Sequence, residues 1–175
     1  MKRLILIITM MAMSSMAQAR GGSDGGILLS FNAFMYQQSS ESDPGGTGDS
    51  STSIYDLKIG NVGSGGLYLG GIYSVRSHSG TGITSEDGKA LGASIGYMGD
   101  GGFFIQGHYY LTAENGTFKK GSGYQADFGY LSAVSGAFQV GVELTYRNIT
   151  YKEAPGLNSY TSKELFPMLT AAFSF

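Results

Sequence analysis

The chain has 175 residues, 29 of them glycine and 12 tyrosine, no cysteine, and only 14% charged residues. Soluble domains average about 25% charged residues, so this composition does not provide the usual charged surface. The formal net charge of −2 argues against a nucleic acid as partner, and the lack of cysteine excludes disulfides and thiolate chemistry.

The first 19 residues have the pattern of a cleavable signal peptide. Two basic residues precede an apolar run that ends at Met13, and a small-x-small cleavage site follows at Ala17 to Ala19. The run is too short to span a bilayer, which requires about 20 apolar residues. We expect cleavage after Ala19, with residues 1–19 as the signal peptide and residues 20–175 as a single mature domain.

Beyond that segment, eight stretches alternate apolar and polar residues with the period of 2 that is typical of β-strands with two different faces. In the fifth stretch, for example, Phe103 and Tyr109 share one face, whereas His108 and Thr112 share the other. The predicted strands cover residues 27–38, 53–61, 66–76, 89–98, 103–113, 123–134, 137–151 and 161–175. Sparse charge and amphipathic strands fit a barrel in lipid, because a closed sheet satisfies every backbone polar group.

The connections between these strands alternate in length. The long ones are residues 39–52, 77–88, 114–122 and 152–160, and the short ones are residues 62–65, 99–102 and 135–136. An even number of antiparallel strands puts both termini at one end, so we expect short turns in the periplasm and long loops outside. The predicted fold class is all-β, an eight-stranded antiparallel up-and-down transmembrane β-barrel.

The mature chain resembles the small eight-stranded outer-membrane barrels of the OmpX, OmpA-membrane-domain and OmpW kind. The resemblance rests on the signal peptide, the strand count, the alternating connections and the terminal Phe173-Ser174-Phe175, and on no family-specific motif. It implies the outer membrane of a Gram-negative bacterium as location, and outer-membrane lipid and the barrel assembly machinery as partners. It also implies that Phe173 and Phe175 form the assembly signal, and we expect a monomer.

A soluble eight-stranded barrel of the lipocalin or streptavidin sort, exported to the periplasm, is the competing architecture. Alternation with period 2 fits both, so the composition of each face must distinguish them. The polar face carries too few ionisable residues for a wet exterior, which needs about 25–35%. Tyrosines such as Tyr97, Tyr124 and Tyr130 lie on the apolar face near strand ends, where a membrane barrel has its aromatic girdles. Both observations favour the membrane barrel.

The polar face predicts a closed, polar interior, because eight strands leave room only for side chains or one small ligand. Strand register sets Arg147 opposite Glu164 and His108 close to Asp127. We expect one connected network, with Arg147 and Glu164 in its upper part and Glu143, Lys58 and His108 at mid-height. The inward ionisable residues are Asp56, Lys58, Arg76, His108, Asp127, Glu143, Arg147 and Glu164.

Three functions are open at this point. The favoured one is a non-enzymatic surface barrel, structural or in contact through its loops with an unknown external ligand or surface. The second is a conduit for small or apolar solutes of the OmpW kind. The third is a lipid A-modifying enzyme, for which His78, between Ser77 and Ser79, provides a base beside hydroxyl nucleophiles. No recognised motif surrounds His78, so we expect no catalytic residue, cofactor or metal.

Overall fold

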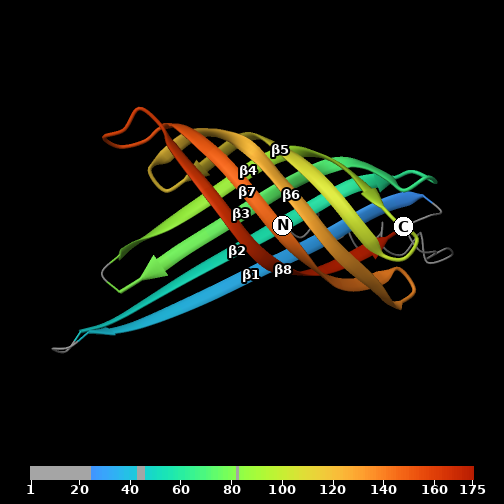
Figure 1. Cartoon of the computed structure of the whole chain (residues 1–175), viewed down its shortest axis with the longest axis horizontal. Helices are drawn as coiled ribbons and strands as arrows, with labels where there is room; N and C mark the ends of the chain where they lie inside the picture. The colour runs from blue at the N-terminus through green and yellow to red at the C-terminus, as the bar shows by residue number, and fades with distance from the viewer. Residues whose placement is uncertain (1–24, 43–45, 82) are drawn as a thin grey trace, which may run out of the picture.

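A computed structural model describes residues 25–42, 46–81 and 83–175. Each strand pairs antiparallel with the next and β8 pairs with β1, so the sheet closes into a barrel (Figure 1). The strands are β1 (Gly26–Ser42), β2 (Gly46–Val62), β3 (Leu67–Gly80), β4 (Ile83–Met98), β5 (Phe103–Asn115), β6 (Phe118–Ser135), β7 (Phe138–Glu153) and β8 (Tyr160–Ser174). The predicted fold class is confirmed. The predicted signal peptide lies outside the described residues.

The outside of the barrel is apolar and its inside is largely polar. On β8, the exposed fraction is 69% for Leu169 but 5% for its neighbour Thr170, and the same alternation runs along the other strands. A soluble barrel has the opposite arrangement, whereas in lipid an apolar exterior with all backbone groups paired inside the sheet is stable. No helix in the described part of the chain is long and apolar enough to span a membrane.

The strands are longer at the outer end than the sequence predicted. β1 and β2 stay paired up to Ser42↔Gly46, and β3 and β4 up to Gly80↔Ile83. The prediction of long outer loops is therefore wrong for the first three connections, whereas the fourth remains a loop over residues 154–159 between β7 and β8. Segments rich in serine, threonine and glycine still carry backbone donors and acceptors, and a continuing antiparallel partner satisfies these groups whatever the side chains are. The outer hairpins project as paired strands (Figure 1).

Tight turns, the start of β1 and the carboxy-terminal Phe175 lie at the other end of the barrel. Gly66 and Gly102 close two of these turns with φ of 81° and 86°, and a Cβ there would lie 2.3 and 2.1 Å from a backbone oxygen. Only glycine fits both positions. Ile27 and Phe175 exchange two backbone hydrogen bonds of 2.9 Å, so the first and last strands close the barrel at the end with the short turns.

One irregularity in β5 changes which side chains face inward. The pairing of β5 with β6 shifts between Tyr110 and Ala113, which adds one residue to β5 as in a β-bulge. Thr112, predicted to face inward, is exposed, while Ala113 is only 2% exposed. The prediction for Thr112 is wrong because the bulge moves the inward face by one residue.

Candidate functional site

At the end with the short turns, the interior of the barrel is filled by apolar side chains. This corrects the expectation of a wholly polar interior. Tyr68 is fully buried there, and Met98 and Phe104 are at most 5% exposed. The layer consists of Leu28, Val62, Tyr68, Met98, Phe104, Leu131 and Ala172. Bulky side chains fill the space that a small barrel encloses, so this apolar floor leaves no polar route toward the end with the short turns.

A buried ion cluster lies above the apolar floor, with Lys58 at its centre. Lys58 Nζ donates to Asp127 Oδ2 at 2.5 Å and to the two Glu143 oxygens at 2.9 and 3.1 Å. The side chains of all three residues are at most 1% exposed. Lys58 comes from β2, whereas its partners come from β6 and β7, so the ammonium group links opposite walls. Without it, two carboxylates would share the low-dielectric interior with no lysine between them.

His108 joins this cluster from β5. Its Nε2 lies 2.7 Å from Asp127 Oδ2, and its Nδ1 lies 2.6 Å from Ser94 Oγ. Strand register had placed His108 close to Asp127, and the structure shows that contact. A Ser-His-Asp chain can activate a nucleophile, but Ser94 is only 6% exposed and the cleft at the outer mouth does not include it. The contact holds the network together, and Ser94 and His108 also line part of a separate hollow over β4, β5 and β6.

Arg147 does not pair with Glu164, although the two are register partners on β7 and β8. Its Nη2 donates to both Asp56 oxygens at 3.0 Å, and its Nε donates to Gln125 Oε1 at 2.7 Å. The predicted Arg147–Glu164 pair is wrong because the guanidinium reaches across the barrel to β2. Glu164 instead pairs with Arg76 of β3.

Gln125 connects the two buried ion groups and was not predicted. Its Nε2 donates to Asp56 Oδ2 and to Asp127 Oδ2, each at 3.0 Å. Six of the eight predicted residues therefore belong to one network, while Arg76 and Glu164 form a separate pair nearer the outer end. The six residues are Asp56, Lys58, His108, Asp127, Glu143 and Arg147.

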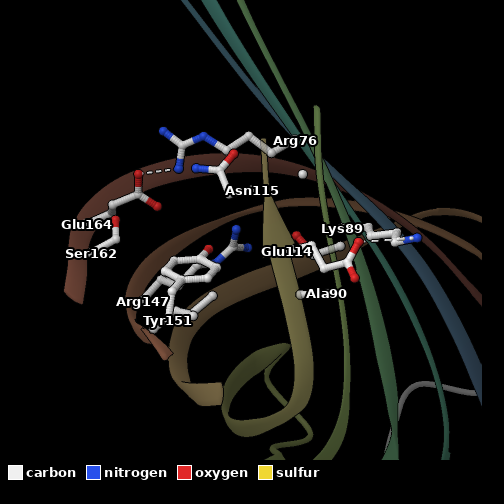
Figure 2. Close-up of a pocket in the computed structure, with 12 residues that line it drawn as sticks. Arg76, Lys89, Ala90, Glu114, Asn115, Arg147, Tyr151, Ser162 and Glu164 are labelled. Carbon is white, nitrogen blue, oxygen red and sulfur yellow. Dashed lines mark hydrogen bonds and ion pairs between the residues drawn. The ribbon is translucent and has the colours of Figure 1, made fainter. Parts of the chain in front are cut away.

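The outer mouth holds a narrow cleft with a cavity volume of about 20 Å³ above this network. Figure 2 shows the Arg76–Glu164 pair on one side, the Lys89–Glu114 pair on the other, and Arg147 with Tyr151 below. Phe166 lies under the same region, with its ring centroid 5.3 Å from the guanidinium carbon of Arg147. The cleft is thus polar at its rim, and Phe166 lies beyond Arg147, outside the residues that line the cleft.

The barrel wall is interrupted on that side, between β1 and β8. These strands pair only from Leu28↔Ser174 to Ala33↔Leu169, although β1 continues to Ser42 and β8 begins at Tyr160. We call the two unpaired edges, residues 34–42 and 160–168, the seam. Figure 1 shows β1 and β2 diverging from β7 and β8 in this part. The base of the seam is apolar and is formed by Phe34, Ile54, Phe166 and Met168.

Pro167 explains why the β1–β8 ladder ends where it does. Phe175 exchanges hydrogen bonds with Ile27 on β1, whereas Ser174 donates toward β7. Backbone groups alternate in direction along a strand, so odd-numbered residues of β8 face β1. The next hydrogen-bonded pair after Ala33↔Leu169 would need a donor at residue 167. Proline has no N–H, and this position is an edge at which proline is tolerated.

Replacing Pro167 by valine is therefore expected to extend the ladder. The side chain at residue 167 faces outward and is exposed, so valine adds an N–H without changing the interior. We expect a donor to the backbone of Met35 and slow hydrogen exchange of the new amide, measured by NMR in micelles. Leu169→Val, within the existing ladder, is the control and should leave the exchange pattern unchanged. Rapid exchange of the amide at residue 167 would contradict this account.

The serine and histidine residues of the enzyme hypothesis do not come together. His78 Nδ1 lies 2.9 Å from Thr52 Oγ1, whereas Ser77 Oγ donates to Asp87 at 2.9 Å. Successive residues of a strand point to opposite faces, so the imidazole is directed away from both serines that flank it. Within the described ranges, no group of three or more acidic or histidine side chains is placed to hold a metal ion.

Comparisons with known proteins identify one similar solved structure. No protein-family model matches the chain, and no curated protein matches it in sequence. The structure is similar to the solid-state NMR structure of outer membrane protein AlkL in DMPC lipid bilayers, with a TM-score of 0.48 and 14% sequence identity. The similarity covers 91% of this chain and 94% of that one.

Proposed function

We propose that the protein is an outer-membrane barrel that passes small apolar molecules from its outer mouth into the surrounding lipid through the seam. Its apolar exterior supports a position in the membrane. Phe103, Tyr130 and Phe173 are exposed near the end with the short turns, and Tyr109, Tyr124 and Tyr146 are exposed farther out. Aromatic rings at two levels of an apolar band are typical of the two membrane interfaces.

A straight passage through the barrel is unfavourable. A molecule in the outer cleft would meet the Lys58–Asp127–Glu143 cluster and then the apolar floor. Opening the cluster would separate buried charges, and an unpaired buried ion costs several kcal/mol. The interior therefore supports closure toward the periplasmic end, as expected from the size of an eight-stranded barrel.

Beyond Arg147, a path from the cleft through the seam into the lipid is lined by apolar side chains and crosses no buried ion pair. This observation carries the proposal. Phe34 and Phe166 lie with ring centroids 5.2 Å apart at the base of the seam, where no backbone ladder joins β1 to β8. Separating two apolar side chains costs less than separating buried ions, and lipid can replace the lost contacts. Phe166 also lies beside Arg147, which lines the cleft. A molecule that passed Arg147 toward the lipid would thus meet the apolar side chains of Phe166 and Met168.

A cleavable cross-link across the seam tests this function. The native chain has no cysteine, so Gln37→Cys with Leu165→Cys gives one unique pair on facing edges that can be joined by a bismaleimide containing a disulfide. We expect uptake of an apolar fluorescent probe into lipid vesicles to fall to the protein-free rate when the seam is linked, and to recover after reduction.

The matched control places the same linker lower in the same pair of strands. Phe31→Cys and Ala171→Cys are register partners inside the existing ladder, so linking them leaves the seam unchanged and should not slow uptake. Undiminished uptake with a fully linked seam would refute lateral transfer.

A second candidate is a surface-contact role, favoured by the projecting β1–β2 hairpin. A hollow near its tip is lined by polar residues of β1, β2 and β3, including Gln37 and Ser51, and Ser39 donates to Asp49 across the hairpin at 2.8 Å. Such a surface could bind a polar partner outside the cell. Because Gln37 lines this hollow, the comparison is made within the double-cysteine variant: cleaving the linker should restore uptake without changing the binding of such a partner, which distinguishes the two functions.

A further inference from the structure

The exposed basic side chains of the barrel are confined to one rim. Three of the basic residues in the described part of the chain, Lys58, Arg76 and Arg147, point into the interior. All the others lie in the outer halves of β4, β6, β7 and β8, and we call them the basic collar. The basic collar consists of Lys89, Lys119, Lys120, Lys152 and Lys163.

Acidic residues only partly neutralise the basic collar. Glu114 lies 3.2 Å from Lys119 and 3.5 Å from Lys89, and Glu153 lies 2.5 Å from Lys120. The hydrogen bond from Lys119 lowers the pKa of Glu114, and the hydrogen bond to Glu153 raises the pKa of Lys120, so these groups stay charged at neutral pH. Among the described residues, Lys152 and Lys163 have no ion-pair partner. Two carboxylates thus pair with three of the five lysines, while Glu86 and Asp87 on the outer part of β4 form no ion pair with a lysine in the described part of the chain.

Two of these lysines lie side by side on adjacent strands. The pairs Lys119↔Glu153 and Gly121↔Tyr151 enclose them, so Lys120 and Lys152 are neighbours across β6 and β7, and both are exposed. Like charges in this position are destabilising. Lys120 also has a φ of 52°, the one positive value at a non-glycine residue in the described ranges, and this conformation costs energy in an L-residue. An anion bound between the two lysines would offset their repulsion.

The basic collar lies where the lipid headgroups of the outer leaflet would be. Lys163 follows the outward-facing Leu165, which is 66% exposed, and Lys89 precedes the outward-facing Leu91, which is 53% exposed. Two residues of a strand cover about 7 Å, so each ammonium group is directly above the apolar band. On β6, Lys120 lies beyond Tyr124, whose hydroxyl accepts a hydrogen bond from Asn148.

From these observations we propose that the basic collar binds the phosphate groups of an anionic, phosphorylated lipid of the outer leaflet. The ammonium groups would contact the phosphates, and the acyl chains would lie along the apolar wall of β6 to β8. Charge complementarity and the continuity of the collar with the apolar band identify a lipid rather than a soluble anion. This inference rests on the membrane position proposed above and is independent of transfer through the seam.

Retention of lipid A by the refolded full-length barrel tests the proposal. The protein in phosphatidylcholine nanodiscs is mixed with lipid A, and the bound lipid is quantified by native mass spectrometry. Each lysine near an anionic surface contributes roughly a fivefold gain in affinity. The triple variant Lys120→Gln, Lys152→Gln, Lys163→Gln should therefore bind lipid A about a hundredfold more weakly, and the native protein should bind dephosphorylated lipid A equally weakly.

The control gives the same change in net charge on the β2–β3 side of the same outer rim. Ser51→Glu, Ser53→Glu and Ser79→Glu alter outer positions of β2 and β3 and should retain lipid A. Equal retention by the lysine variant, equal loss in the serine variant, or displacement of lipid A by equimolar inorganic phosphate would each overturn the proposal. If the lysine variant does not fold, Lys163→Gln alone and the dephosphorylated lipid still test it. A barrel with a linked seam should bind the lipid normally, so failure here is distinguishable from failure of the proposed transfer.

Discussion

The Lys58→Met variant is expected to lose about 3–5 kcal/mol of unfolding free energy, because two buried carboxylates lose their shared cation. Lys58 contacts both Asp127 and Glu143 and is 1% exposed. Methionine has a similar length, so the change removes the charge and the three hydrogen bonds while leaving little empty space. Urea unfolding of the refolded protein in detergent micelles measures the difference.

Two further variants separate loss of charge from loss of packing. Adding Asp127→Asn and Glu143→Gln to Lys58→Met removes the whole ion group, and replacing a complete buried ion group costs much less than removing one member. Much of the stability should therefore return. Lys163→Met, at an exposed position, should change the unfolding free energy by no more than about 0.5 kcal/mol. A Lys58→Met variant as stable as the native protein would show that the interior is hydrated in solution.

Alternation along each strand was enough to predict the outside of the barrel. Leu57, Ile95 and Val142 were assigned to one face by parity alone, and each is exposed on the barrel exterior. Parity works here because a shift of one residue would move every apolar side chain inward. It could not reveal the bulge near Thr112, since one extra residue leaves no mark in the composition of the strand.

The inside could be predicted only in part. Strand register brings His108 to Asp127 because their strands are neighbours, and the two are in contact. Arg147 and Lys58 contact partners on strands that are not their neighbours in the barrel. The register between adjacent strands does not predict which side chains meet across the interior. The bridging role of Gln125 could not be predicted for a related reason. Its side chain is neutral, so only the closed barrel shows that it lies between Asp56 and Asp127.

Strand ends were the least predictable feature, although one signal was present. Composition alone predicts loops at the polar tips of β1 to β4, whereas the partner strand decides whether such segments pair. Pro167 was read only as a member of the apolar register of the last strand. Its missing N–H, together with the parity of β8, would have indicated a free edge toward β1. The seam was thus in principle accessible from the sequence once the ring of eight strands was assumed.

The Arg147→Met variant is expected to be destabilised by about 3–5 kcal/mol as well, because Asp56 would keep only the donor from Gln125. Asp56 is fully buried and its oxygens both accept from Arg147. Urea unfolding in detergent micelles measures the loss. It is measured for Arg147→Met alone and in combination with Asp56→Asn or with Glu164→Gln.

Two double-mutant cycles identify the partner of Arg147. Residues that share a hydrogen-bonded ion pair show interaction energies of about 0.5–3 kcal/mol, so Asp56→Asn should make the loss from Arg147→Met much smaller. Glu164→Gln should leave that loss nearly unchanged, because Glu164 pairs with Arg76. Glu164 is the register partner of Arg147. It is therefore the acid that sequence alone predicts as the partner, and the cycle with Glu164→Gln is the control. Stronger coupling to Glu164 than to Asp56 would mean that the guanidinium turns toward the mouth, where it would change the charge of the cleft.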